Sequence, residues 1–159
     1  MHLIVTCRDD AADPGPPILR VMAQSIWVVD DEPLIRAAMM AVLGELGYET
    51  RGFANAEELY VALVEGQGPP GLLLLDQMLP DEDGAAIARS LRERPQYRDI
   101  PILFVTAISD EEAERLEAIA PVVRKPFDFR DLVAAVQEHL PAQPRTPPQG
   151  ALPAADAGA

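Results

Sequence analysis

The stretch from Leu72 to Gly84, which reads LLLLDQMLPDEDG, constrains the fold of this chain more than any other. Four consecutive leucines without polar alternation are typical of a strand buried on both faces, such as a central strand of a parallel sheet. The run ends in Asp76, and Pro80 and the Asp83-Gly84 pair then indicate a turn and a helix start. Open α/β sheets bind ligands at the carboxyl ends of their strands, so Asp76 is the first candidate for chemistry.

Other apolar runs alternate with segments of helical periodicity along the chain. Strands are predicted over residues 26–29, 48–53, 72–75, 100–105 and 122–123, and helices over 33–46, 54–65, 85–94, 110–119 and 128–140. Gly47 is expected to stop the first helix, Asn55 to cap the second and Asp128 to cap the last. The alternation predicts an α/β fold, a five-stranded parallel sheet covered by helices on both faces.

Polar side chains follow four of the five predicted strands. A lone Asp after a strand more often marks only the exit of the chain into solvent. Here, however, the carboxyl ends of parallel strands share one edge, and four polar strand ends at one edge indicate a functional site. The candidate residues are Asp30, Asp31, Asp76, Thr106 and Lys125.

Three carboxylates in one cleft repel each other unless a cation joins them. Hard oxygen ligands suit Mg²⁺, or Mn²⁺, and magnesium in proteins commonly binds a phosphate as well. Lys125 could neutralise a phosphoryl oxygen, and the Thr106 hydroxyl could donate a hydrogen bond to another. Asp76, at the end of the central strand, is placed to act as the phosphoryl acceptor.

Four motifs in this order, VVDDEP, LLLLDQMLPDEDG, FVTA and RKPF, resemble the receiver domain of bacterial two-component response regulators over residues 25–140. The resemblance implies a (βα)5 flavodoxin-like sandwich with strand order 2-1-3-4-5 and Asp76 as phosphoacceptor. It implies Asp30 and Asp31 as metal ligands, the backbone carbonyl of Met78 as a further ligand, and a cis peptide bond before Pro126.

The same resemblance implies a histidine kinase or a histidine phosphotransfer protein as the phosphoryl donor. A chain of this kind would not be an enzyme acting on an external substrate. Because only 19 residues follow Leu140, we expect a single-domain regulator whose output is an unknown protein partner.

Two departures from the family pattern concern the end of the domain. Val122 stands where the family often has an aromatic switch residue three positions before the lysine. The interval from Thr106 to Lys125 is only 19 positions, which predicts a shortened or degenerate fourth helix. Since that helix belongs to the usual dimer face, a monomer or weak homodimer is expected.

Three alternatives remain at this point. An aspartate-nucleophile phosphohydrolase would usually carry a second Asp two positions after the nucleophile, where this chain has Met78. A flavodoxin-like cofactor binder would need a Ser-, Thr- and Gly-rich phosphate loop after the first strand, where this chain has acidic residues. The third alternative is a pseudo-receiver that only binds partners.

Composition limits the partners and the location. The chain has 26 acidic and 13 basic residues and a net charge of −13, which argues against binding nucleic acid through a basic surface. A single cysteine, Cys7, gives no disulfide framework, and no membrane span or secretory signal is present, so a cytoplasmic protein is expected. Residues 1–24 and 141–159 are predicted to be disordered, and Met22 is an alternative start.

Overall fold

The computed structural model describes residues 25–66 and 68–140. Five strands form one parallel sheet in the order β2-β1-β3-β4-β5, which confirms the predicted fold class. The strands are β1 (Ser25–Val29), β2 (Glu49–Phe53), β3 (Leu72–Leu75), β4 (Ile102–Thr106) and β5 (Val122–Arg124). All four leucines of β3 are buried at the centre of the sheet. The predicted terminal extensions, with Cys7 and Met22, lie outside the described residues.

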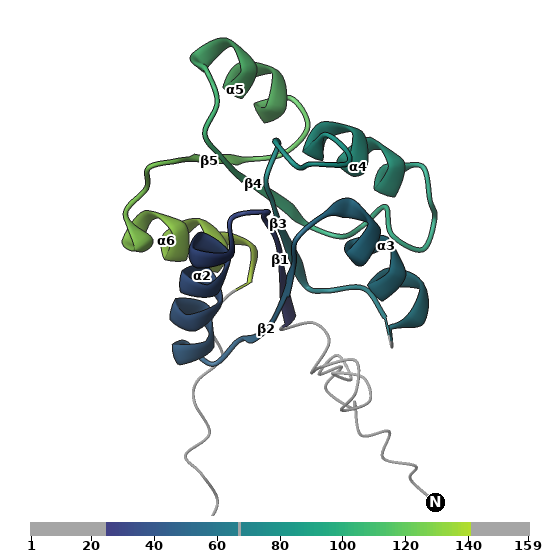
Figure 1. Cartoon of the computed structure of the whole chain (residues 1–159), viewed down its shortest axis with the longest axis horizontal. Helices are drawn as coiled ribbons and strands as arrows, with labels where there is room; N and C mark the ends of the chain where they lie inside the picture. The colour runs from purple at the N-terminus through teal and green to yellow at the C-terminus, as the bar shows by residue number, and fades with distance from the viewer. Residues whose placement is uncertain (1–24, 67, 141–159) are drawn as a thin grey trace, which may run out of the picture.

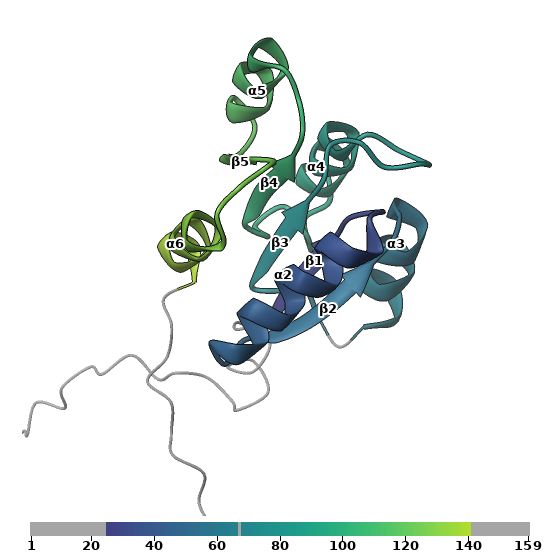
Figure 2. The same cartoon turned by 60° about the vertical axis from the view of Figure 1, so that its left-hand side comes forward.

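Helices cover both faces of this sheet (Figure 1). One face carries α2 (Pro33–Glu45) and α6 (Phe129–His139), and the other carries α3 (Ala56–Glu65), α4 (Gly84–Arg92) and α5 (Asp110–Glu117). Figure 2, from a second direction, shows the same layers. Side chains of β1 alternate between the two faces, so Ile26 packs towards α2 and α6, whereas Trp27 packs towards α3 and α4.

Helix α2 ends where the sequence predicted, but the apolar residue Leu34 in its first turn does not face the core. Gly47 has a φ of 93°, and the N–H groups of Gly47 and Tyr48 donate to the carbonyls of Gly44 and Leu43. This is a Schellman motif, which requires a residue that accepts positive φ. At the other end, Leu34 is 84% exposed, because it lies about 140° around the helix from the buried Met39.

Helix α5, the fourth of the five helices in the described chain, is short, as predicted. It has eight residues and buries only Ala113 and Leu116. Its start is regular, since Ser109 and Glu112 form a reciprocal capping box. Among the described residues, no helix is both long enough and apolar enough to cross a membrane.

Candidate functional site

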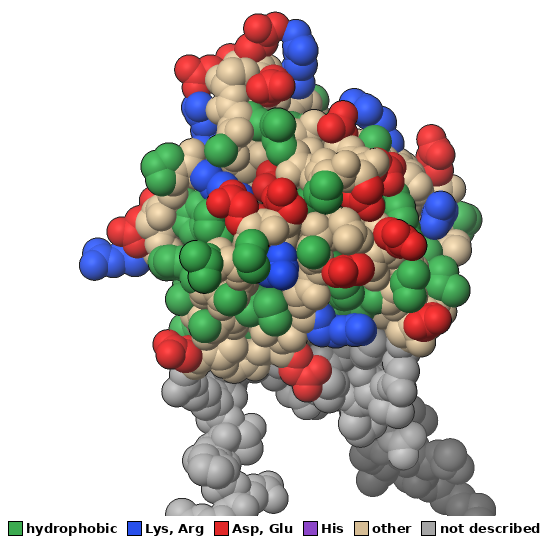
Figure 3. Space-filling model, viewed as in Figure 1, with side chains coloured by type: hydrophobic (Ala, Val, Ile, Leu, Met, Phe, Trp, Pro, Cys, Tyr) green, Lys and Arg blue, Asp and Glu red, His purple; other side chains and the backbone are tan. Residues whose placement is uncertain are grey.

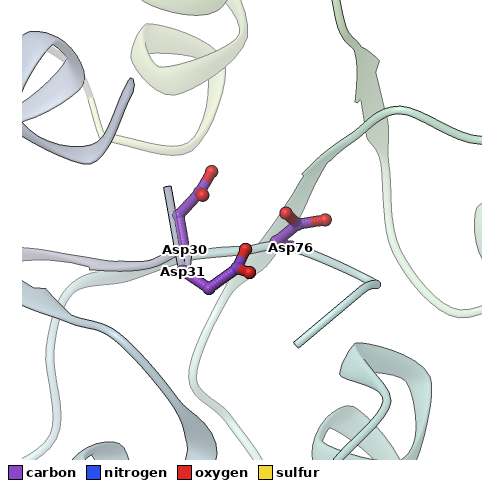
Figure 4. Close-up of side chains that lie close together, drawn as sticks. All are labelled: Asp30, Asp31 and Asp76. Carbon is purple, nitrogen blue, oxygen red and sulfur yellow. The ribbon is translucent and has the colours of Figure 1, made fainter. Parts of the chain in front are cut away.

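The carboxyl ends of the strands bring the predicted site residues together at one edge of the sheet. Asp30 and Asp31 follow β1, and Asp76 follows β3 (Figure 4). One carboxylate oxygen from each of these three residues lies within 4.8 Å of the others. Asp30 and Asp76 are buried, whereas Asp31 is exposed. The cluster therefore presents two fixed carboxylates and one that faces solvent.

Lys125, which follows β5, lies between the buried carboxylates. Its Nζ donates to Asp30 Oδ2 at 2.7 Å, to Asp76 Oδ2 at 3.2 Å and to Glu32 Oε1 at 3.3 Å. Burial alone would lower the pKa of Lys125, but the hydrogen bonds and charges of Asp30 and Asp76 outweigh burial and raise it. Burial also raises the pKa of Asp30, and the Lys125 hydrogen bond only partly offsets this. The lysine is thus a fixed cation among acids.

Backbone N–H groups orient the two buried carboxylates. Asp30 Oδ1 accepts from the N–H of Glu32 at 2.9 Å, and Asp76 Oδ1 accepts from the N–H of Met78 at 3.1 Å. Each Oδ2 atom is thereby left to face Lys125. The Arg36 side chain donates to the carbonyl of Asp30 and fixes the turn that carries the acid pair. Short-range backbone contacts therefore preorganise the site.

Thr106 ends β4 at the same edge. Its side chain is fully buried, and its Oγ1 has no hydrogen-bond partner among the described residues. A buried hydroxyl without a partner is costly, so Thr106 Oγ1 can donate a hydrogen bond to a group that enters the site. The Lys125-Pro126 peptide bond is cis, as the resemblance implied. Val122 packs partly buried against the core in the position of the usual aromatic.

Four charged side chains of the site, Asp31, Glu32, Asp76 and Lys125, line a cleft with a volume of about 470 Å³. The other lining residues are apolar and are Met78, Leu79, Pro80 and Ala107. Met78 is 63% exposed, so its side chain stands at the entrance of the cleft. The cleft therefore combines charged side chains with a small apolar wall.

Sequence reasoning missed three residues around this cleft. Glu32 contacts Lys125, although it was not among the candidate residues predicted from the sequence. Gly84 lies so close to Asp76 that a Cβ on it would stand 2.3 Å from the Asp76 carbonyl oxygen. Asp81 accepts hydrogen bonds from the start of α3. The DEDG letters after Pro80 signal a turn, but only tertiary structure reveals these contacts.

The residues present fit a divalent cation. Three carboxylates of one sheet edge supply hard oxygen atoms within 4.8 Å of one another, and no Cys or His belongs to this cluster. Mg²⁺ prefers such ligands. It also usually keeps several bound waters, so it can be held on the solvent-facing side of the cluster, where Asp31 lies. The Thr106 hydroxyl, which has no partner among the described residues, lies at the same edge of the sheet and suits an anion bound next to the metal.

This fold and this site define a flavodoxin-like α/β protein with an acidic, lysine-containing cleft at the carboxyl edge of its sheet. Residues 26–137 match the response regulator receiver domain family. The chain therefore belongs to that family, whose domains are the signalling domains of two-component systems.

Similar proteins are regulators of this kind. The chain is 37% identical to the DNA-binding transcriptional regulator NtrC of Azospirillum brasilense over 86% of this chain and 27% of NtrC. It is 35% identical to the phosphate regulon regulatory protein PhoB of Pseudomonas aeruginosa over 76% of this chain and 53% of PhoB. The chain thus spans between about a quarter and about a half of the length of these two relatives.

A solved structure with the same fold is the response regulator TrrA of Thermotoga maritima in complex with Mg²⁺ and beryllium fluoride. The two chains are 32% identical, the match covers 74% of this chain and 99% of TrrA, and the TM-score is 0.64. The bound ions are those of TrrA.

Proposed function

We propose that this chain accepts a phosphoryl group on Asp76 from a phosphohistidine of a histidine kinase or a histidine phosphotransfer protein. A carboxylate oxygen of Asp76 attacks the phosphorus, and an acyl phosphate O–P bond forms as the P–N bond breaks. The imidazole nitrogen of the donor keeps the electron pair of that bond and takes a proton from solvent. Such transfers depend on positioning and on charge neutralisation more than on covalent help from the protein.

Each site residue has a role in this proposal. Asp30, Asp31, Asp76 and the backbone carbonyl of Met78 would hold Mg²⁺, or Mn²⁺, which when bound neutralises charge on the phosphoryl oxygens. Lys125, already 3.2 Å from Asp76, neutralises a second oxygen as a point charge. The Thr106 hydroxyl donates a hydrogen bond to a third and so gains the partner that it otherwise lacks.

One observation carries the assignment of Asp76 as the acceptor. Asp76 ends the central strand, is only 5% exposed, and still lines the cleft beside Lys125. Membership of the receiver family favours this role over the hydrolase and the flavodoxin-like alternatives. A pseudo-receiver would keep the fold without accepting a phosphoryl group, so incubation with a phosphoryl donor distinguishes it from a receiver that works.

We further infer that the domain signals through protein contacts and does not turn over a metabolite. Lys and Arg side chains are scattered singly among Asp and Glu on the face shown in Figure 3, and acidic side chains gather over α5. Together with the net charge of −13, a face of this kind does not favour contact with the phosphate backbone of nucleic acid. The relatives named above are DNA-binding or transcriptional regulators, so residues outside the receiver domain would decide such binding.

The test is incubation with acetyl phosphate and Mg²⁺ followed by intact mass measurement. The wild-type chain is expected to gain one phosphoryl group, and Asp76→Asn is expected to gain none. Asp83→Asn is a matched control, because Asp83 is an exposed aspartate of the same loop whose side chain does not cap α4. Phosphorylation of Asp76→Asn to the wild-type extent would refute the assignment, and no mass gain in any of the three would favour the pseudo-receiver.

A further inference from the structure

The loop of residues 77–83, here called the acceptor loop, joins β3 to α4 but is bonded to α3. Asp81 Oδ1 accepts from the N–H of Ala56 at 3.0 Å, and Asp81 Oδ2 accepts from the N–H of Glu57 at 3.0 Å. The next residue, Glu82, accepts from the hydroxyl of Tyr60 at 3.1 Å. Two consecutive acids of the acceptor loop therefore contact a helix about 25 residues earlier in the chain.

The start of α3 consequently has two caps. Asn55 Oδ1, from within the helix's own segment, accepts from the N–H of Glu58 at 2.9 Å. Asp81 supplies the second cap from the acceptor loop, and its charge suits the positive end of the helix dipole. The N–H groups of Ala56 and Glu57 hold the pKa of Asp81 below its ordinary value. Both caps stabilise the same helix, but only Asp81 also belongs to the loop that lines the cleft.

The acceptor loop forms the apolar wall of the cleft and orients the acceptor. Met78, Leu79 and Pro80 line the cleft, and the N–H of Met78 donates to Asp76 Oδ1. The base of the loop is closed by the N–H of Gly84, which donates to the carbonyl of Gln77 at 2.9 Å. Asp81 follows the lining residues directly, so its bonds to α3 hold the outer part of the loop.

We propose that Asp81 is a positioning residue, which anchors the acceptor loop on α3 and thereby sets the place of the Met78 backbone beside Asp76. The proposal rests on the proposed function, in which this cleft takes Mg²⁺ and a phosphoryl group. Binding free energies are reciprocal: if the anchor favours the bound loop, then a bound ligand must stabilise the start of α3 by the same amount. Asp81 thus couples the phosphoryl site to α3.

The competing explanation is that Asp81 only caps a helix. Asn55 distinguishes the two explanations, because its cap bond is made within the segment of α3 itself, to the N–H of Glu58. Asp81→Ala and Asn55→Ala each remove a cap and should lower thermal stability to a similar extent. Only Asp81→Ala should change the cleft. Asp81→Asn keeps one acceptor oxygen of two, so it should be intermediate, and it serves if Asp81→Ala does not fold.

The experiment uses the full chain and measures Mg²⁺ affinity by calorimetry. Asp81→Ala is expected to weaken Mg²⁺ binding about five-fold, at the lower end of usual coupling between sites. Asp81→Asn is expected to weaken it less than Asp81→Ala does, and Asn55→Ala to leave it unchanged. In hydrogen exchange, Mg²⁺ with beryllium fluoride should slow exchange at Ala56 and Glu57 in the wild type and in Asn55→Ala, but not in Asp81→Ala.

Equal Mg²⁺ affinities and equal ligand-dependent protection in Asp81→Ala and Asn55→Ala would overturn the inference and leave the proposed function standing. If the wild-type chain bound no Mg²⁺ and gained no phosphoryl group from acetyl phosphate, the proposed function would fail and this inference with it. The mass measurement on the wild type therefore tells the two failures apart.

Discussion

At the scale of single residues, Lys125 and Asp31 belong to one site but contribute in different ways. The Lys125 side chain is 8% exposed and contacts the buried oxygen atoms of Asp30 and Asp76. Asp31 is exposed at the rim of the cleft, where a cation would reach it from solvent. A higher Mg²⁺ concentration can compensate for the loss of one metal ligand. It cannot compensate for the loss of a fixed charge that would contact the phosphoryl group.

We therefore expect Asp31→Ala and Lys125→Met both to slow phosphorylation by acetyl phosphate but to respond differently to Mg²⁺. Asp31→Ala should weaken Mg²⁺ binding at least about ten-fold, and high Mg²⁺ should restore much of its rate. Lys125→Met should stay slow at every Mg²⁺ concentration. The measurement is the initial rate of mass gain across a Mg²⁺ titration. Equal rescue of the two variants would show that these roles are wrongly divided.

At the scale of elements, the first residue of α4 packs closely against the backbone of the acceptor, and a comparison of two helix glycines shows this. A Cβ on Gly84, the first residue of α4, would meet backbone atoms of Asp76 and Gln77, which cannot move aside without shifting the acceptor. A Cβ on Gly44, near the end of α2, would have no described atom within 4 Å. The same substitution should therefore have opposite effects at the two positions.

Gly84→Ala is expected to lower the free energy of unfolding by about 1–3 kcal/mol, as overpacking does, and to slow phosphorylation. Gly44→Ala is expected to raise it by up to about 1 kcal/mol, because Ala is the better helix former, and to leave phosphorylation unchanged. Urea unfolding and the mass assay measure these effects. If Gly84→Ala were instead more stable than the wild type and were phosphorylated normally, the backbone around Gly84 would have space for a Cβ, and the prediction would be wrong.

The double cap of α3 leads to a pH-dependent prediction. The pKa of Asp81 is lowered by folding, so its stabilising effect is complete above the unfolded value of about 3.9 and is lost as pH falls through the folded value. Asp81→Ala should cost about 1 kcal/mol at pH 7, or less because Asp81 is exposed, and nothing once Asp81 is protonated. The cost of Asn55→Ala, a residue that does not titrate, should persist. Urea unfolding at pH 7 and at a pH below the folded pKa of Asp81 measures the two costs. A cost of Asp81→Ala that does not change with pH would contradict the prediction.

At the scale of the whole molecule, the sequence predicted most of what places the site and little of what surrounds it. Buried strands followed by Asp30, Asp76 and Thr106 are local patterns, and a parallel sheet necessarily brings their ends together. The orientation of Leu34 and the contacts of Asp81 depend on how helices pack and on which backbone groups lack partners. No local pattern encodes these, since the partners lie far apart in the chain.

The gathered carboxylates also predict how the whole domain responds to metal. Asp30, Asp31 and Asp76 have oxygen atoms within 4.8 Å of one another, and Lys125 brings only one positive charge to the three carboxylates. A bound cation therefore relieves the repulsion that remains. A ligand that binds only the folded chain stabilises it by about 2.7 kcal/mol at one hundred times its Kd, which raises the Tm by on the order of 10 °C for a domain of this size.

Thermal unfolding with Mg²⁺ should show this rise relative to NaCl at the same ionic strength, and EDTA should remove it. Asp83→Ala should keep the rise, and Asp31→Ala should need more Mg²⁺ to reach it. If Mg²⁺ and NaCl gave the same Tm, the carboxylates would not form a metal site, because general screening would then account for the whole effect.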